Sequence, residues 1–228
     1  DKSIKIKEKK HNKSGMAEDL IELVSYLVRK NKFNKALKYL ENAEKIAVEL
    51  NNDKIDGDIA YNYSVVYENM GRDKDAIPYS YKAMDKFKNT GDNERLAKAY
   101  NGLARLYKNL RRPNDMRKYI RKALKEIDKV DESEKDMKLY TSLYTNLGVS
   151  YLDESNQEYA LKYLKTAHDI SDKSQSLSIL PAILNNIAYI HRQRAENKEA
   201  LSYLYRALRL LEGMEDKLTE GIILYNIA

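Results

Sequence analysis

One eight-residue pattern recurs five times along the chain, and this repeat limits what the chain can fold into. The first copy, Ala36-Leu-Lys-Tyr39-Leu-Glu-Asn-Ala43, has alanine at its first and last positions and tyrosine at its fourth. The other copies cover residues 76–83, 116–123, 160–167 and 200–207, with Met116 in place of one alanine. They follow at intervals of 40, 40, 44 and 40 residues, which define a repeat frame for the chain. A fixed period of this size predicts stacked supersecondary units that bury their apolar faces only against their neighbours.

Each copy is predicted to be the second helix of a helix-turn-helix unit. Its alanines and tyrosine are spaced so that they share one helical face. A first helix with its own apolar stripe precedes each copy, as Tyr144, Leu147, Gly148 and Tyr151 do in the fourth unit. Only 8 glycines and 3 prolines occur in 228 residues, which leaves little room for strands and long loops. The sequence therefore predicts an all-α solenoid of five full repeats and the first helix of a sixth.

Two segments are expected along the chain, a basic leader at 1–16 and a helical repeat region at 17–228. The repeats are expected at about 17–56, 57–96, 97–140, 141–180, 181–220 and, in part, 221–228. The 44-residue interval adds about one helical turn between Ala123 and Thr141, which should lengthen the helices or the corner without breaking the stack. The leader is rich in lysine. It is interpreted as a disordered linker, with binding to nucleic acid or anionic lipid as the alternative.

The residue types that catalysis and metal binding need are scarce. The chain has no cysteine, which excludes disulfides and thiolate chemistry. His11, His168 and His191 lack metal-ligand spacing, and no glycine-rich phosphate loop occurs. We therefore expect no enzyme, no cofactor and no metal site. No apolar run approaches the ~20 residues that a membrane helix needs. A soluble chain is expected, and the sequence does not decide between the cytoplasm and the periplasm.

The repeat pattern resembles the tetratricopeptide repeat. A first helix of the small–large–Tyr type followed by Ala-x₂-Tyr-x₃-Ala carries this resemblance over residues 17–228. The chain departs from the family in its period of 40 residues, where 34 is usual. The family's frequent tryptophan is also replaced, by Leu20, Ala60, Tyr100, Tyr144, Leu184 and Leu224. The longer period is similar to that of kinesin light chains, bacterial peptide-pheromone receptors and the sensor portions of bacterial kinases and transcription regulators.

The resemblance implies a right-handed superhelix whose first helices line a concave groove that binds peptides or proteins. An asparagine recurs near one position of the first helix, at Asn62, Asn101, Asn146, Asn186 and Asn226. In the resembled family this position faces the groove and can pair with a peptide backbone. The alternative is that these side chains bond to the neighbouring helix and only order the stack. The two interpretations stay open at this point.

Other residues are expected to line the same groove because they sit at compatible helical spacings. They are Ser25, Tyr61, Arg105, Lys108, Asn109, Tyr189 and Arg192. The third repeat is also strongly basic, with eleven Lys or Arg against three acidic residues over 98–129. This charge predicts either a landing patch for an acidic partner or an ordinary solvated helix face. The repeated tyrosines are interpreted as core.

The first functional hypothesis is a non-catalytic module that binds a protein or peptide, with no nucleic acid predicted. The alternative is a sensory or regulatory region of a longer bacterial signalling protein, such as a histidine kinase or a transcription regulator. The start at Asp1 and the stop at Ala228 inside a predicted helix favour a piece of a longer polypeptide. A third hypothesis is self-association through the unpaired sixth first-helix. The sequence does not identify the ligand.

Overall fold

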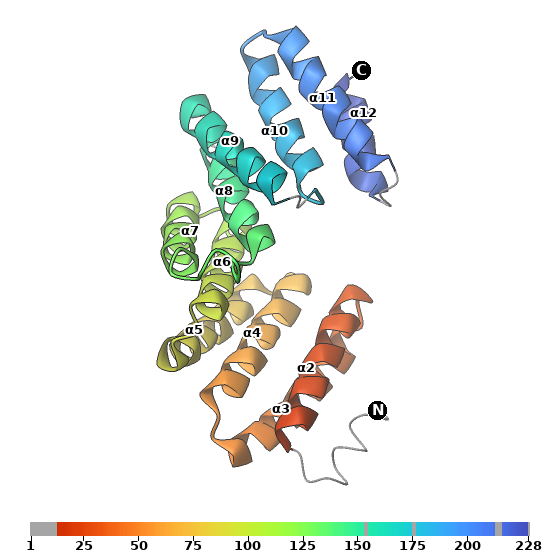
Figure 1. Cartoon of the computed structure of the whole chain (residues 1–228). Helices are drawn as coiled ribbons and strands as arrows, with labels where there is room; N and C mark the ends of the chain where they lie inside the picture. The colour runs from red at the N-terminus through yellow and green to blue at the C-terminus, as the bar shows by residue number, and fades with distance from the viewer. Residues whose placement is uncertain (1–12, 153–154, 175–176, 213–215, 228) are drawn as a thin grey trace. The chain divides into compact units, whose positions relative to one another are not determined.

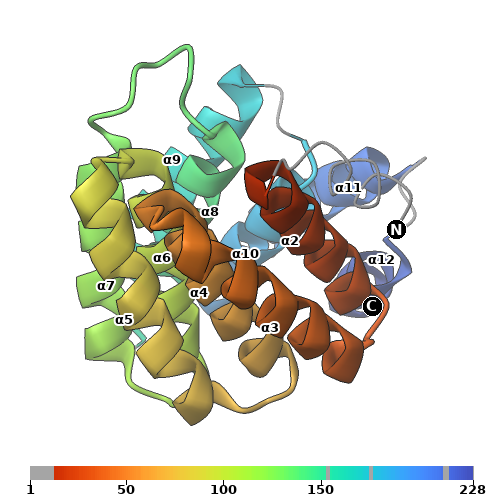
Figure 2. The same cartoon turned by 90° about the horizontal axis from the view of Figure 1, so that it is seen from below.

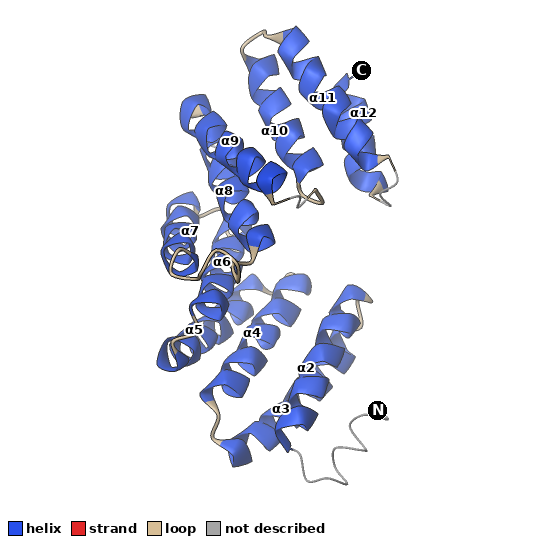
Figure 3. Cartoon of the chain, in the orientation of Figure 1, coloured by secondary structure: helices blue, strands red, loops and turns tan. Residues whose placement is uncertain are grey.

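The computed structural model describes residues 13–152, 155–174, 177–212 and 216–227. Over these residues the chain forms eleven α-helices and no strand, as Figure 3 shows. The helices, labelled in Figure 1, are α2 (Lys13–Arg29), α3 (Phe33–Leu50), α4 (Asp53–Asn69), α5 (Asp73–Thr90), α6 (Asn93–Asn109), α7 (Pro113–Ile127), α8 (Met137–Leu152), α9 (Gln157–Lys173), α10 (Leu180–Gln193), α11 (Asn197–Leu211) and α12 (Lys217–Ile227). Because α2 begins at Lys13, residues 13–16 of the expected leader are helical, and residues 1–12 lie outside the described part.

Helices pair into hairpins, as the sequence predicts. The closest packing joins α2 to α3, α4 to α5, α6 to α7, α8 to α9 and α10 to α11. The second helix of a hairpin then packs against the next first helix, as α3 does on α4 and α5 on α6 (Figures 1 and 2). The predicted all-α solenoid of helix-turn-helix repeats is confirmed.

The chain divides into two compact units, Asp1–Val130 and Asp131–Ala228. We call them the N-terminal unit, which holds α2–α7, and the C-terminal unit, which holds α8–α12. The boundary falls in the connection between Ile127 and Met137, where the frame has its 44-residue interval. Helices α7 and α8 are 15 and 16 residues long, against 18 for α5, so the insertion lengthens the corner and not these helices. Continuity of the stack across this corner stays a prediction.

The repeated alanines and tyrosines form the contact between the two helices of each hairpin. In all five copies the first and last positions of the pattern, Met116 included, are at most 4% exposed. From the second copy onward the tyrosine stacks on a ring of its own first helix, with centroid distances of 4.8 Å for Tyr79 and Tyr63 and 5.4 Å for Tyr119 and Tyr107. The interpretation of these tyrosines as core is therefore confirmed. In the last hairpin the first-helix ring is that of His191, whose centroid lies 5.3 Å from that of Tyr203.

The turn inside each hairpin also repeats. Its left-handed residue falls at one position of the frame, at Asn31, Gly71, Arg111, Ser155 and Ala195, with φ between 55° and 71°. The residue after it donates its backbone N–H to a carbonyl five residues earlier, as Arg72 does to Tyr67 at 2.9 Å. This bond satisfies a carbonyl that the end of the first helix leaves unpaired. Only at Gly71 does the sequence supply the residue type that adopts this conformation without strain.

Three tyrosine hydroxyls join the helices α5, α6 and α7 in the N-terminal unit. The hydroxyl of Tyr81 lies 2.8 Å from that of Tyr119 and 3.2 Å from that of Tyr107. The side chains of Tyr107 and Tyr119 are buried, and Tyr81 covers them from the second helix of the preceding repeat. These hydrogen-bonded hydroxyls therefore join two neighbouring repeats, and each belongs to a side chain with a large apolar ring.

Two helical glycines give a matched test of the close packing between the helices. A Cβ at Gly148 would lie 2.6 Å from Cγ of Leu164 and 3.2 Å from the carbonyl of Ala160, whereas a Cβ at Gly221 would meet nothing within 4 Å. We expect Gly148→Ala to lower the free energy of unfolding by about 1–2 kcal/mol, because overpacking outweighs the better helix propensity of alanine. Gly221→Ala should raise it by about 0.5–1 kcal/mol. Urea unfolding of both variants measures this, and a stabilised Gly148→Ala would contradict the close approach.

The tyrosine cluster should make stability fall at high pH. Burial, together with the hydrogen bond to Tyr81, raises the pKa of Tyr107 to about 12. The same phenol in the unfolded chain ionises near pH 10, so the unfolded state alone gains charge between about pH 10 and 12. The contribution of Tyr107 is thus complete below about pH 10 and is lost as the pH rises toward 12. Urea unfolding at several alkaline pH values should show a shallower loss for Tyr107→Phe than for the unchanged chain, and equal slopes would refute the assignment.

Candidate functional site

Ion pairs join the neighbouring first helices α4 and α6 in the N-terminal unit. Arg95 Nε lies 2.9 Å from Oδ1 of Asp58. Ten residues further along each helix, nearly three turns, Arg105 donates to both carboxylate oxygens of Glu68, at 2.9 and 2.7 Å. Such a bidentate pair fixes the orientation of both side chains. The predicted groove residue Arg105 is therefore bound inside the repeat stack.

These pairs also shift pKa values. Burial disfavours the charged form of Arg105, but its hydrogen bonds to Glu68 outweigh this and raise its pKa. Burial raises the pKa of Asp58, and the attraction of Arg95 only partly opposes it. Arginine stays charged in either case, because its guanidinium is not deprotonated in proteins.

The predicted asparagine ladder is not uniform in the structure. Asn62 is 8% exposed and donates its amide to the carbonyl of Asp58 in its own helix at 2.8 Å, and Asn101 is 7% exposed. Asn146 and Asn186 are half-buried. Asn226 donates to Oδ1 of Asn185, on the preceding first helix, at 2.8 Å. The bond of Asn226 agrees with the stack-ordering interpretation, whereas Asn62 bonds within its own helix, and peptide binding by the ladder stays a proposal.

A polar pocket of about 290 Å³ lies in the N-terminal unit. It brings together Ser25, Tyr61 and Asn62, which the sequence predicts, with Asp58, Phe87, Glu94, Arg95 and Lys98, which it missed. Its charges are paired, since Arg95 contacts Asp58 and Lys98 lies 2.6 Å from Glu94. The missed signal is the spacing of opposite charges, because Asp58 and Arg95, like Glu68 and Arg105, are 37 residues apart. Of the other predicted residues, Lys108 is exposed and Asn109 donates to Asp73 at 2.9 Å.

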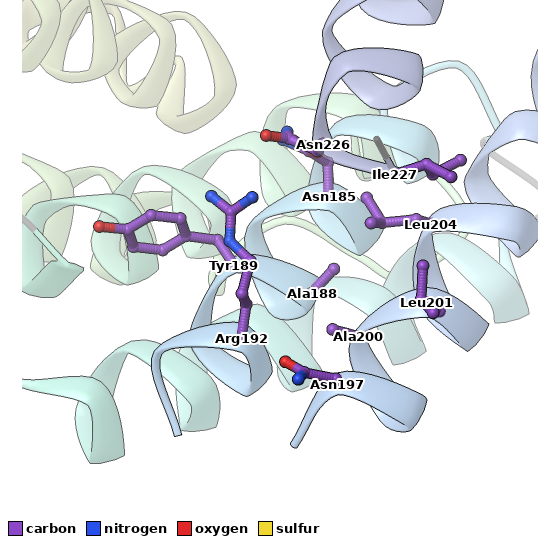
Figure 4. A pocket seen from close by; sticks show the side chains of 10 residues that line it. All are labelled: Asn185, Ala188, Tyr189, Arg192, Asn197, Ala200, Leu201, Leu204, Asn226 and Ile227. Carbon is purple, nitrogen blue, oxygen red and sulfur yellow. The ribbon is translucent and has the colours of Figure 1, made fainter. Parts of the chain in front are cut away.

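A second pocket, of about 330 Å³, lies between α10, α11 and α12 of the C-terminal unit (Figure 4). It is lined by Asn185, Ala188, Tyr189, Arg192, Asn197, Ala200, Leu201, Leu204, Asn226 and Ile227. The structure thus brings the predicted residues Tyr189, Arg192 and Asn226 together, and adds Asn185 and Asn197, which the sequence did not single out. Figure 4 shows Leu201 and Leu204 on one side of the pocket and Tyr189 and Arg192 on the other, with the tyrosine ring pointing away from the leucines. We call this site the α10–α12 pocket.

Arg192 distinguishes this pocket from the N-terminal one. Its guanidinium lies 5.9 Å from the ring centroid of Tyr189, and it has no carboxylate partner among the residues that the structure describes. The nearby carboxylate of Glu196 instead lies 2.5 Å from Nδ1 of His191. The α10–α12 pocket therefore offers an apolar floor, amide groups and an available cation, a combination that suits a peptide segment.

Some basic side chains of the third repeat lie against other side chains of the same repeat. Lys122 lies over the rings of Tyr100 and Tyr119, at 5.6 and 5.2 Å from their centroids. Arg117 is buried, and one of its guanidinium nitrogens lies 2.5 Å from Oδ1 of Asn114. Five of the eleven basic side chains lie on α7, a second helix, and do not add to the side chains of the first helices.

No group of three or more His, Asp or Glu side chains within the described ranges could hold a metal ion. None of the described helices is long and apolar enough to cross a membrane.

The fold and its pockets define a helical-repeat protein built from paired helices. The tetratricopeptide repeat family matches residues 97–129 and 182–212, which lie in the third and fifth repeats of the frame. These matches show tetratricopeptide repeats in two segments of the chain, in line with the resemblance. Such repeats form protein-interaction scaffolds.

Several solved structures share the fold at low sequence identity. BtubC (BKLC) from P. vanneervenii is 20% identical, with a TM-score of 0.81 over 93% of this chain and 88% of that one. Aspartyl phosphate phosphatase F from Bacillus subtilis is 19% identical, with a TM-score of 0.79 over 96% of this chain and 57% of that one. The apo form of RapI is 18% identical, with a TM-score of 0.78 over 91% and 74%. No curated protein sequence matches the chain.

The bidentate pair between Arg105 and Glu68 should stabilise the N-terminal unit. We expect Glu68→Gln to lower the free energy of unfolding by about 1 kcal/mol, because the half-buried guanidinium loses its charged partner while solvent still screens part of the effect. Glu44, paired with Lys82 at the same kind of spacing but with both side chains nearly half exposed, is the matched control. Glu44→Gln should change stability by less than about 0.5 kcal/mol. If urea unfolding showed equal losses of free energy for Glu68→Gln and Glu44→Gln, the pair between Arg105 and Glu68 would stabilise the protein no more than an exposed ion pair.

Proposed function

We propose that the chain is a non-catalytic module that binds a protein or peptide segment through side chains of its first helices. The observation that supports this best is the α10–α12 pocket. There, three residues chosen from the sequence for ligand contact, Tyr189, Arg192 and Asn226, line one hollow with an apolar floor. Tyrosine and arginine are the residue types that most often anchor interfaces.

The proposal includes a preference for acidic ligands. Arg192 is exposed and has no carboxylate partner among the described residues, whereas Arg95 and Arg105 are already paired. A carboxylate on the ligand would gain a charge-assisted hydrogen bond at Arg192 without displacing an internal partner. The remaining ladder residues, Asn146 and Asn186, would extend the contact surface within the C-terminal unit. We also propose that the repeats from about 17 to 228 serve as one binding region.

A second role is a sensory or regulatory region of a bacterial signalling protein. It is supported by likeness of fold to a signal-transduction ATPase from Pyrococcus horikoshii described as having a tetratricopeptide repeat sensor, 15% identical over 94% of this chain and 33% of that one. Aspartyl phosphate phosphatase F points to the same class of role. This role also requires that ligand binding change the activity of another domain or protein. The binding role does not require such a change.

Selection of short peptides on the purified chain tests the binding role. Peptides that bind should lose about tenfold in affinity for Arg192→Glu, which corresponds to about 1.4 kcal/mol, and a similar amount for Tyr189→Ala. Arg209, an exposed arginine on α11 that does not line the pocket, gives a control with the same charge change. Fluorescence anisotropy of labelled peptides would measure each affinity. Equal affinities for Arg192→Glu and Arg209→Glu would exclude the α10–α12 pocket as the binding site.

A further inference from the structure

Helix α7 carries more positive charge on its exposed side than the other second helices carry at the same frame positions. Four exposed residues of α7 are cationic, namely Lys118, Arg121, Lys122 and Lys125. The corresponding residues are Lys38, Glu41, Asn42 and Lys45 on α3, Pro78, Tyr81, Lys82 and Asp85 on α5, Lys162, Lys165, Thr166 and Asp169 on α9, and Ser202, Tyr205, Arg206 and Arg209 on α11. With Lys and Arg counted as +1 and Asp and Glu as −1, these sets sum to +1, 0, +1 and +2, against +4 on α7. Only α7 therefore has a cation at all four positions.

Three lysines of this side form a row along one helical face, which we call the lysine row. It consists of Lys118, Lys122 and Lys125, at positions i, i+4 and i+7. Within the described residues, no carboxylate pairs with any of the three. Like charges at these spacings destabilise a helix, so the lysine row has an energetic cost that an acidic partner would remove.

The carboxylates of α7 itself are engaged with other cations. Asp115 lies 2.7 Å from a guanidinium nitrogen of Arg112, and Glu126 pairs with Lys129. Both acidic residues are partly buried, whereas the lysine row is exposed. The row is therefore a concentrated positive surface that its own helix does not neutralise.

Two lysines of the row are held against a fixed aromatic ring. The Nζ atoms of Lys118 and Lys122 lie 5.8 and 5.2 Å from the ring centroid of Tyr119. This ring is 6% exposed, stacks on Tyr107 and is hydrogen-bonded to Tyr81 of the neighbouring helix α5 (Figure 2). Attraction between an ammonium group and the face of a ring orients the lysine side chain. A partner would thus immobilise these lysines at a smaller entropic cost than lysines that move freely in solvent.

We propose that the lysine row docks an acidic α-helix of a partner protein. Carboxylates at positions i, i+4 and i+7 of that helix would lie against Lys118, Lys122 and Lys125 and form charge-assisted hydrogen bonds with them. None of these lysines lines the α10–α12 pocket. The inference therefore goes beyond the proposed function and adds a second contact surface, on a second helix of the N-terminal unit.

Spacing favours a helix over other acidic ligands. Along the axis of α7, Lys122 and Lys125 lie about 6 and 10 Å from Lys118, and carboxylates at i, i+4 and i+7 of another helix repeat at the same distances. An extended peptide places the side chains of one face about 6.6–6.8 Å apart, so its third carboxylate would fall about 3 Å beyond the third lysine. Nucleic acid also fits less well, because a protein that binds DNA strongly makes roughly 6–10 phosphate contacts and this side of α7 offers fewer cations.

Two designed peptides test the proposal on the full chain. Both are fluorescein-labelled helical peptides of alanine, glutamine and glutamate with the same composition. The first has glutamates at i, i+4, i+7 and i+11, on one face, and the second has them distributed around the helix. We expect the one-face peptide to bind at least about tenfold more tightly at low ionic strength, by fluorescence anisotropy. Its affinity should fall as salt is added, because the contact is ionic and exposed.

Variants of the chain locate the binding, and the repeat frame supplies a matched control. The double variant Lys118→Glu, Lys125→Glu should lose at least about tenfold in affinity for the one-face peptide. The control is Lys38→Glu with Lys45→Glu, which makes the same charge change at the same frame positions of α3, where both lysines are exposed. It should lose less than about twofold. Lys118→Ala with Lys125→Ala removes repulsion within the row, so it keeps the test valid if the charge-reversed chain unfolds, and it should lose about threefold to tenfold.

Each contrary result has a distinct meaning. The proposal is overturned if both peptides bind equally, or if the two charge-reversed double variants lose the same affinity. It is also overturned if duplex DNA or phosphatidylserine vesicles bind more tightly than the one-face peptide and lose binding in Lys118→Glu, Lys125→Glu. If Arg192→Glu weakens the peptide and the lysine variants do not, the peptide occupies the α10–α12 pocket. That result overturns this inference and leaves the proposed function standing.

Discussion

The contact between an alanine-lined second helix and the stacked rings of its first helix is the interaction on which the rest of the structure depends. Alanine at both ends of the pattern, as at Ala160 and Ala167, brings the helix axes close, and the tyrosine between them fills the space at the side. A tyrosine ring buries about 150–250 Å², so each hairpin gains most of its apolar burial here. What remains exposed is covered by the next hairpin, which is why the repeats stack.

Polar contacts between repeats determine which polar side chains of the first helices remain available to bind a ligand. They recur at separations of 36–38 residues, just under one period, as between Asp58 and Arg95 or between Gln157 and Arg194. In the N-terminal unit these contacts pair Arg95 and Arg105 with carboxylates of the neighbouring first helix, so these two side chains are not free to bind a ligand. In the C-terminal unit the bond between the first helices α12 and α10, from Asn226 to Asn185, is neutral, and Arg192 has no carboxylate partner within the described residues. The two units therefore present different chemistry from the same frame.

The fold could be predicted from the sequence almost completely, and the candidate site only in part. Helical periodicity identifies residues that share a face, and three of the residues expected along the groove, Tyr189, Arg192 and Asn226, line one pocket. It does not identify the partner of a polar side chain, because the partner sits one repeat away and depends on the offset between helices. Arg105 was for this reason expected in the groove, although Glu68 binds it, and Asn185 and Asn197 were missed.

The sequence by itself determined the class of fold, the register of the repeats and the identity of the core, because a strict period of small and aromatic residues is compatible with few packings. Only the tertiary structure decided which charges neutralise one another and which hollow stays open. It also placed the inserted residues in the corner at 128–136 and not in the helices. The physical reason is that burial depends on residue type and spacing, which can be read from a short stretch of sequence. Ion pairs and pockets depend instead on distances of a few ångströms between helices that are distant in sequence.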